Sequence, residues 1–257
     1  MAHRGEKLDL ELRSRQLGHP IIKPNGAPIQ PRDAATLIIW RNASSGVEVL
    51  MGRRPRRASF VPNFFVFPGG RLDPTDYSIA SATPLDPNFI QSMGVRGDYK
   101  KAEALAIAGV RETFEETGLM IADRANTESA PTWPEWRALR LAPALDRLRY
   151  FGRAITSPMS PIRFNARFFI TRAEFTRGQI GGSGELSELM FYPVTVVLEY
   201  MPILDVTEFM LKELMRYASD SSGMDRRTPI FCYRRTDPYV RYAASRKTNQ
   251  KTVGKRA

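Results

Sequence analysis

The sequence predicts an α/β protein in which a mixed sheet packs against helices as a sandwich. Short apolar, β-rich runs are interleaved with helical segments along the 257 residues, without the regular spacing of repeated strand–helix–strand units. The composition, 42% hydrophobic and 25% charged, is ordinary for a globular chain, so one domain with a sizeable core is expected. No stretch approaches the roughly 18 consecutive apolar residues of a membrane helix. We therefore expect a cytoplasmic protein without a membrane partner.

The first predicted elements form a β-hairpin. Residues 35–41 and 47–53 are apolar runs separated by the turn-like segment 42–46, which is the pattern of two antiparallel strands. The other predicted elements are a strand at 63–67, helices at 99–117 and 136–151 (the latter interrupted at Pro143), strands at 167–171 and 189–192, and a closing helix at 206–218.

The two ends of the chain differ in character from the domain expected at 32–243. Residues 1–31 contain recurrent prolines and predict an extended arm. The net charge is +11, of which the stretch from Arg226 to Ala257 carries +9. Residues 244–257 are therefore predicted to form a basic disordered tail. Such a tail most simply keeps the protein soluble, with binding of RNA or another polyanion as the alternative.

Cysteine and histidine are scarce, which excludes several kinds of site. Cys232 is the single cysteine, so an internal disulfide and a cysteine-based zinc cluster are excluded. His3 and His19 are the only histidines, and both lie in the N-terminal arm. If the chain is an enzyme, its working groups are therefore expected to be carboxylates, Lys, Arg or Tyr. Cys232, beside two aromatic residues, is expected to be a buried thiol rather than a nucleophile.

Three glutamates in the last turn of the predicted helix 99–117 are the strongest indication of chemistry. At 100° per residue, Glu112, Glu115 and Glu116 fall about 180–280° from Ala106, on the side opposite the expected core face. A solvated acidic face is the ordinary interpretation. However, these carboxylates repel one another at i, i+3 and i+4, and the helix dipole disfavours them at a C-terminus, where Gly118 ends the helix. Such a cluster favours a bound cation, and oxygen ligands without His or Cys suit Mg²⁺ or Mn²⁺.

A second candidate element is the segment 67–71, Phe-Pro-Gly-Gly-Arg, which follows a predicted strand. Glycines at such a position let the backbone approach a metal or a phosphate closely. Alone the segment is also an ordinary turn.

Glu103 and residues 111–119, Arg-Glu-Thr-Phe-Glu-Glu-Thr-Gly-Leu, resemble the second half of the nudix box, G-x5-E-x7-R-E-U-x-E-E-x-G-U. Thr113 departs from the aliphatic position U. The resemblance implies a nudix-type α/β/α sandwich, with an inserted helical segment here. It also implies roles by position. Glu112, Glu115 and Glu116 would be metal ligands, and the Gly69 carbonyl would complete the metal shell. Glu112, Glu115 or a later carboxylate would act in catalysis, Arg111 and Glu103 would orient these carboxylates, and Gly70 and Gly118 would be structural glycines.

The position of the box glycine is ambiguous. Gly97 lies six residues before Glu103, as the box requires, but it follows no predicted strand. Gly70 has the expected strand context and is therefore preferred. This choice places 32 residues between Gly70 and Glu103, and predicts insertions at about 71–102 and 123–155.

Segments 49–55, 60–62, 66–73 and 161–169 are similar to the coenzyme A diphosphatase branch with an enlarged box. The implied reaction cleaves the pyrophosphate of CoA or acyl-CoA into phosphopantetheine and adenosine 3′,5′-bisphosphate. ADP-ribose or NADH is the alternative substrate. An RNA-binding or cap-processing protein that uses the basic tail is the alternative of another class. The chain could also form a homodimer.

Further candidates surround this centre. Arginines in the segment 53–57 and at position 71 flank the expected site and could clamp phosphates; the candidates are Arg53, Arg54, Arg57 and Arg71. An additional carboxylate is expected before the strand 189–192, with Glu185 preferred over Glu188. Trp133 and Trp136 are expected to pack a helix against the core, with a lid over the substrate as the alternative.

Overall fold

The computed structural model describes residues 6–7, 29–58, 61–125, 133–220, 227–234 and 237–242. The tail at 244–257 and almost all of the arm at 1–31 lie outside these ranges, so both remain predictions. Among the described residues, no helix has the length and apolar character needed to cross a membrane.

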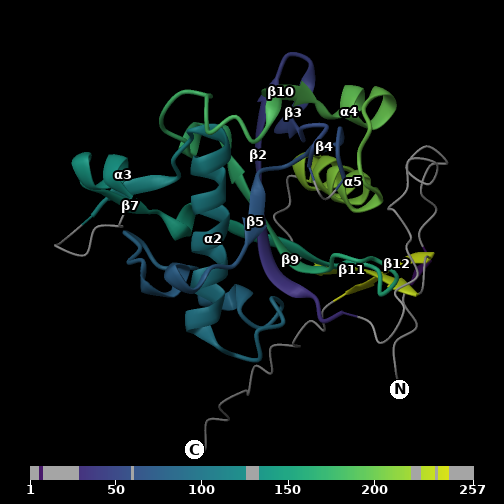
Figure 1. The fold of residues 1–257 in the computed structure, drawn as a ribbon, viewed down its shortest axis with the longest axis horizontal. Coiled ribbons are helices and arrows are strands. Elements are labelled where there is room, and N and C mark those ends of the chain that lie inside the picture. Colours follow the sequence, from purple (N-terminus) through teal and green to yellow (C-terminus); the bar gives the residue numbers. More distant parts are fainter. Residues whose placement is uncertain are drawn as a thin grey trace, which may run out of the picture.

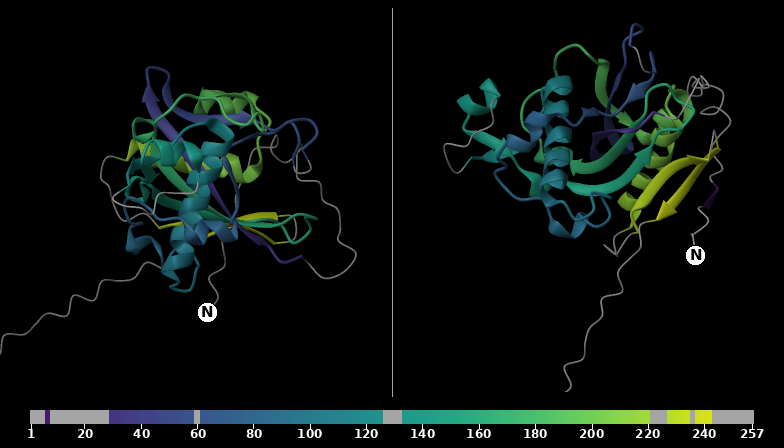
Figure 2. Two further views of the ribbon diagram at one scale, coloured as in Figure 1. Left: turned by 60° about the vertical axis from the view of Figure 1, so that its left-hand side comes forward. Right: turned by 60° about the horizontal axis from the view of Figure 1, so that its bottom comes forward.

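In the described part of the chain, ten strands form one mixed sheet (Figures 1 and 2). The main path runs through β1 (Glu6–Lys7), β12 (Asp237–Tyr242), β11 (Pro229–Arg234), β8 (Arg149–Ile155), β9 (Phe164–Arg172), β2 (Arg32–Ala43), β3 (Gly46–Arg53) and β10 (Ser187–Pro193). Two short strands lie off this path: β4 (Phe65–Val66) pairs with β3, and β5 (Gly69–Arg71) pairs with β2. The β2–β9 and β8–β11 pairs are parallel and the others antiparallel, which confirms the predicted mixed sheet.

Helices cover both faces of this sheet (Figure 1). The α2 helix (Tyr99–Thr117) lies on one face, and α4 (Val194–Tyr200) and α5 (Asp205–Ser219) lie on the other. Alternation along β2 explains the two layers: Leu37 and Ile39 join the core beneath α2, whereas Ile38 and Trp40 join the core beneath α5. The fold is therefore the α/β/α sandwich that was predicted.

Smaller elements complete the described fold. A separate two-stranded sheet and a short helix lie beside α2, and four one-turn 3-10 helices connect the larger elements. The bounds are β6 (Ala122–Arg124), β7 (Leu141–Pro143), α3 (Pro134–Ala138), η1 (Pro74–Ser78), η2 (Pro87–Phe89), η3 (Leu145–Arg147) and η4 (Ala173–Phe175).

The hairpin, the glutamate-bearing helix and the closing helix are confirmed. In the hairpin, Trp40 lies opposite Val49 and Ala43 opposite Gly46. The predicted strands at 167–171 and 189–192 lie within β9 and β10. The predicted strand at 63–67 is present only as β4, and α4, β11 and β12 were not predicted.

The predicted helix at 136–151 is wrong. Only α3 is α-helical there, because Arg140 has a φ of 53°, which is incompatible with a right-handed helix. Pro143 also disfavours helix at the residue before it. Beyond it, β8 pairs with β9, with Tyr150 opposite Phe169. The apolar residues of this segment are therefore buried by strand pairing, so the segment forms part of the core sheet instead of an inserted helix.

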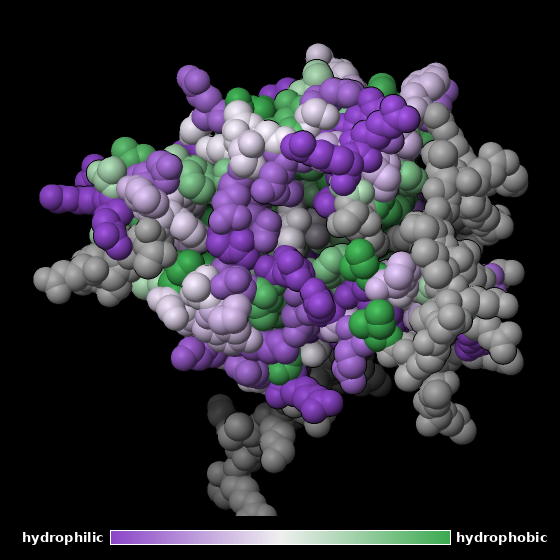
Figure 3. Space-filling model, in the orientation of Figure 1, coloured by the Kyte–Doolittle hydropathy of each residue, from purple (hydrophilic) through white to green (hydrophobic). Residues whose placement is uncertain are grey.

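Figure 3 shows hydrophilic residues gathered over the middle of the face that α2 occupies. The candidate site lies on this side of the sheet.

Candidate active site

The α2 helix places the glutamates where the sequence predicted them. Asp98 caps its first turn by accepting a hydrogen bond from the Lys101 amide at 2.9 Å. Gly118 ends it in the left-handed conformation, with φ of 74°, and donates its amide hydrogen to the Phe114 carbonyl at 2.8 Å. All three box glutamates therefore lie in the last two turns of a well-capped helix.

The three glutamates differ sharply in exposure. Glu116 is 5% exposed, whereas the side chains of Glu112 and Glu115 are 16% and 46% exposed. The prediction that all three share a face away from the core is therefore wrong for Glu116. A helical wheel locates one buried face, but β5 also packs against α2 and covers Glu116.

Gly69 and Gly70 lie directly against these carboxylates. The Gly69 amide donates a hydrogen bond to Oε2 of Glu116 at 2.9 Å. A Cβ at position 70 would lie 2.3 Å from the carboxylate carbon of Glu112, so only glycine allows this approach. By contrast, a Cβ at Gly97 would meet nothing within 4 Å. The segment was expected to be a turn, but Gly69–Arg71 forms strand β5 and pairs with Ala34, Ala35 and Thr36.

Arg111 links the glutamates to the segment that follows β5. Its Nη1 donates to Glu112 Oε1 at 2.8 Å and to Glu115 Oε2 at 3.1 Å. Its Nε and Nη2 donate to the two carboxylate oxygens of Asp76 at 2.8 and 3.1 Å, and Nη2 also donates to the Arg71 carbonyl at 2.9 Å. All three nitrogens of the guanidinium are therefore held, and its plane is fixed relative to Glu112 and Glu115.

Asp76, which is fully buried, was not among the predicted site residues. It also accepts the Asp73 amide at 2.8 Å in the capping box of η1. Glu103, to which an orienting role was assigned, makes no described contact with Arg111, because it lies about two helical turns away; it interacts with the Tyr99 hydroxyl. The sequence contains one indication of this role: Asp76 lies six residues after Gly70, which is the spacing between the glycine and the first carboxylate of the nudix box.

Burial dominates the electrostatics of the glutamates. Burial raises the pKa of Glu116 to about 8, although the Gly69 amide opposes the shift. Burial also raises the pKa of Glu112, against the opposing charge of Arg111. Carboxylates with raised pKa values next to one another are stabilised in the charged form when a cation binds.

The donor set fits Mg²⁺ or Mn²⁺ in its chemistry, since it consists of carboxylate oxygens, from buried through exposed, beside a strand backbone. The side chains are not already gathered around one point: within the described ranges, no three carboxylate, imidazole or thiol groups converge closely enough to hold a metal ion. Arg111 lies between Glu112 and Glu115 instead. The metal assignments of Gly69, Glu112, Glu115 and Glu116 therefore remain predictions.

A glycine-rich loop at 178–184 caps the end of α2. The Gly181 amide donates to the Thr117 carbonyl at 2.8 Å, and the Ser183 amide donates to the Glu115 carbonyl at 3.0 Å. A Cβ at Gly182 would lie 2.2 Å from the Glu116 carbonyl oxygen. The loop thus donates hydrogen bonds to carbonyls that the helix leaves unpaired. This role was not predicted from the sequence.

The loop leads to Glu185, which is exposed and close enough for its charge to contribute to the raised pKa of Glu116. Glu188 forms an ion pair with Arg53 at 2.9 Å instead. The preference for Glu185 over Glu188 is consistent with this placement and remains a prediction.

The predicted phosphate-binding arginines are dispersed. Arg53 is held by Glu188, and Arg57 is exposed. Arg54 lies near Glu116, whose pKa its charge lowers, and its buried Nε has no hydrogen-bond partner in the described structure. Arg71 lies elsewhere, in the pocket described next.

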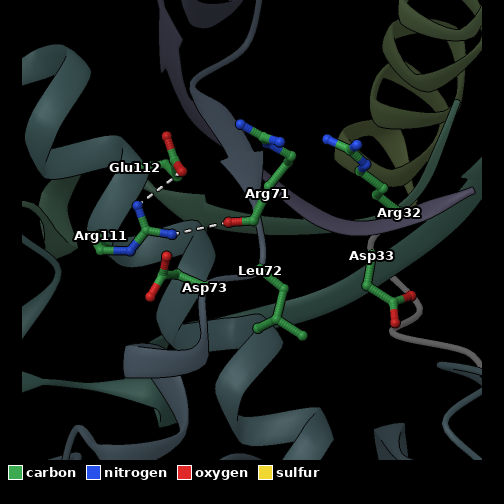
Figure 4. A pocket seen from close by; sticks show the side chains of 7 residues that line it. All are labelled: Arg32, Asp33, Arg71, Leu72, Asp73, Arg111 and Glu112. Carbon is green, nitrogen blue, oxygen red and sulfur yellow. Dashed lines mark hydrogen bonds and ion pairs between the residues drawn. The ribbon is translucent and has the colours of Figure 1, made fainter. Parts of the chain in front are cut away.

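An open pocket of about 630 Å³ adjoins Glu112 (Figure 4). Its lining residues are Arg32, Asp33, Arg71, Leu72, Asp73, Arg111 and Glu112. The pocket therefore extends from the glutamate-bearing end of α2 past β5 to the start of β2.

The tryptophans and the cysteine have structural roles. Trp136 is fully buried and makes edge-to-face contacts with Phe114 and Trp133, with ring centroids 5.7 and 4.9 Å apart. Packing of this segment against α2 is thus confirmed. Cys232 is buried, as predicted.

Comparisons with known proteins concern the fold and the family. No protein-family model matches the chain. Acyl-coenzyme A diphosphatase NUDT19 of Xenopus laevis is 31% identical over 110 residues, which cover 35% of this chain and 29% of that protein. The chain spans less than a third of the curated relatives it matches. The crystal structure of a nudix hydrolase from Alicyclobacillus acidocaldarius is 29% identical, with a TM-score of 0.57 over 74% of this chain and 93% of that one.

Proposed function

Because this chain belongs to the nudix hydrolase superfamily, we propose that it hydrolyses the pyrophosphate linkage of a nucleoside diphosphate derivative in a metal-dependent reaction. The observation that carries the proposal is the meeting of the buried Glu116 and the partly buried Glu112 with the close-packed glycines of β5. A solvated acidic face would not require a strand backbone packed against it. A cation site next to a phosphate site explains both features.

Glu116, Glu112 and Glu115 would hold Mg²⁺ or Mn²⁺ together with the Gly69 carbonyl. The chemistry that such an ion supplies when bound is neutralisation of phosphate charge and activation of water. Arg111 would hold Glu112 and Glu115 apart in fixed orientations, because its guanidinium is itself anchored by Asp76.

A carboxylate would accept the proton of the attacking water. In the reaction, a bond forms between the water oxygen and one phosphorus while the bridging P–O bond breaks, so the pyrophosphate yields two phosphate monoesters. Glu112 and Glu115 are candidates for the base, and the exposed Glu185 beside Glu116 is a third. Arg54 would bind a phosphate oxygen, and its position near Glu116 and its buried Nε without a described hydrogen-bond partner support this role.

CoA or acyl-CoA is the substrate class that we favour. It is supported by the partial likeness to an acyl-coenzyme A diphosphatase and by an open pocket of about 630 Å³ beside Glu112, which is within the size range of ligand sites. The products would be phosphopantetheine, or its acyl form, and adenosine 3′,5′-bisphosphate.

The test is a product assay with the purified 257-residue chain, Mg²⁺ or Mn²⁺, and five substrates: CoA, an acyl-CoA, ADP-ribose, NADH and capped RNA. We expect the highest kcat/KM with CoA or acyl-CoA, and no hydrolysis in EDTA. If kcat/KM is highest with ADP-ribose or NADH, pyrophosphate hydrolysis is retained as the reaction but CoA is rejected as the substrate class. Absence of metal-dependent hydrolysis of every substrate would refute the proposed activity.

The RNA alternative has its own test. If the basic tail binds a polyanion, the affinity for RNA should fall steeply with salt and should be lost when residues 244–257 are deleted. We expect the deletion to leave hydrolysis of the small substrates unchanged.

A further inference from the structure

The side chains of two arginines in the pocket have no partner among the described residues. Arg32 and Arg71 are exposed, and neither side chain makes a hydrogen bond or an ion pair with any residue that the structure describes. The third arginine of the pocket, Arg111, is fully engaged by Asp76, Glu112 and Glu115. The pocket thus contains two cationic groups whose hydrogen-bonding capacity is unused.

The acids of the pocket do not neutralise these arginines by contact. Asp33 is paired with Lys101 at 2.6 Å and with Arg167. Asp73 accepts hydrogen bonds from the amide and hydroxyl of Thr75 at 2.8 and 2.7 Å. The remaining acid, Glu112, belongs to the glutamate cluster. An anionic ligand is therefore the group that would complement Arg32 and Arg71.

Strand register brings the two arginines to one face. Arg71 lies directly opposite Ala34, and Arg32 precedes Ala34 by two residues, so all three side chains leave the sheet in the same direction. Diagonal neighbours of this kind are about 7–8 Å apart, within reach of long side chains. Figure 4 shows the Arg32 and Arg71 side chains extending in the same direction from their strands.

The neighbouring register positions face the other way. Gly70 lies opposite Ala35. A Cβ added at Gly70 would point at Glu112, and the Ala35 side chain faces Gly109 of α2. The arginine side chains therefore leave the strands in the direction opposite to the one that meets Glu112, although Arg32, Arg71 and Glu112 all line the same pocket.

We propose that Arg32 and Arg71 form a second anion subsite, which binds a phosphomonoester of the substrate that is not cleaved. Two guanidinium forks on one face suit the tetrahedral oxygens of a terminal phosphate. The subsite would discriminate between nucleotides with and without a phosphate on the ribose. This inference rests on the proposed function, since it assumes that the pyrophosphate occupies the glutamate side of the pocket.

The test is binding of two nucleotides that differ by one phosphate, adenosine 3′,5′-bisphosphate and AMP, measured by calorimetry in EDTA. Because EDTA removes the metal, the result does not depend on catalysis. We expect wild-type chain to bind the bisphosphate at least about tenfold more tightly, which corresponds to about 1.4 kcal/mol. The Arg32→Gln/Arg71→Gln variant should lose this difference while its affinity for AMP changes little.

The matched control is Arg137→Gln, because Arg137 is an exposed arginine on α3 outside the pocket. It should retain the wild-type difference. Equal binding of the two nucleotides by wild type, or a retained difference in the double variant, would overturn the subsite. Loss of the difference in Arg137→Gln as well would overturn it too, because a general charge effect would then suffice. If the wild-type chain still binds adenosine 3′,5′-bisphosphate more tightly than AMP but hydrolyses no substrate, the proposed function is refuted and the anion subsite is retained.

Discussion

Replacing Asp76 by asparagine would remove the charge that anchors Arg111. Asp76 is fully buried and the Arg111 side chain is 11% exposed, so solvent screens this ion pair little. Breaking a buried pair from one side costs about 3–5 kcal/mol. Asparagine can still accept one hydrogen bond, so we expect the lower end, about 3 kcal/mol. For a chain of this size that corresponds to a fall in Tm of about 6–12 °C.

The assay combines thermal unfolding with steady-state kinetics. Arg111 freed from Asp76 would reorient Glu112 and Glu115, and a displacement of about 1 Å at a catalytic group can cost up to about 100-fold in rate. Asp86→Asn is the matched control, because Asp86 also caps a 3-10 helix, through the Asn88 amide at 2.9 Å, but contacts no arginine among the described residues. It should cost little, because Asn caps a helix about as well as Asp. If Asp76→Asn proves as stable and as active as Asp86→Asn, the anchoring role is refuted.

Three further predictions concern the loop and the titrating groups. Gly182→Ala should lower both kcat and stability, the latter by about 1–3 kcal/mol, because its Cβ would meet the Glu116 carbonyl at 2.2 Å. The control Gly184→Ala is also at positive φ but has nothing within 4 Å, so it should cost only the backbone strain of about 1–2 kcal/mol. Equal kcat losses in the two variants would contradict this prediction. In EDTA, denaturation midpoints should fall as pH rises from about 5 to above 8, since the folded state keeps a proton on Glu116 (pKa about 8) that the unfolded chain releases; Glu116→Gln should flatten this profile, and an unchanged profile would exclude Glu116 as its source. Burial alone would raise the pKa of Asp33, but its two cationic partners outweigh burial and lower it, so its contribution to stability should be present above its ordinary pKa and be lost on acidification; Asp33→Asn should therefore show less acid destabilisation than wild type.

The sequence predicted those parts of the site that depend on local signals. The cap at Asp98, the helical periodicity and the left-handed Gly118 all lie within one segment, so α2 and its glutamates could be located without tertiary information. The hairpin was predictable for the same reason, since its strands are adjacent and joined by a short turn.

The missing parts depend on contacts between distant segments. Asp76 meets Arg111 across 35 residues, and only the spacing from Gly70 pointed to it. Glu116 was expected on an open face because a helical wheel does not include β5. The segment 136–151 has apolar residues compatible with a helix, but pairing of Tyr150 with Phe169 determines its conformation.

The central claim, that the glutamates beside β5 hold a catalytic metal, is tested most directly by kcat of Glu116→Gln at saturating Mg²⁺ or Mn²⁺. Glu174→Gln, which removes an exposed partner of Arg172, is the matched control. We predict that Glu116→Gln lowers kcat by at least about 10²-fold, as loss of an electrostatic catalytic group does, and that Glu174→Gln has wild-type activity. A Glu116→Gln variant with near-wild-type kcat would contradict the account.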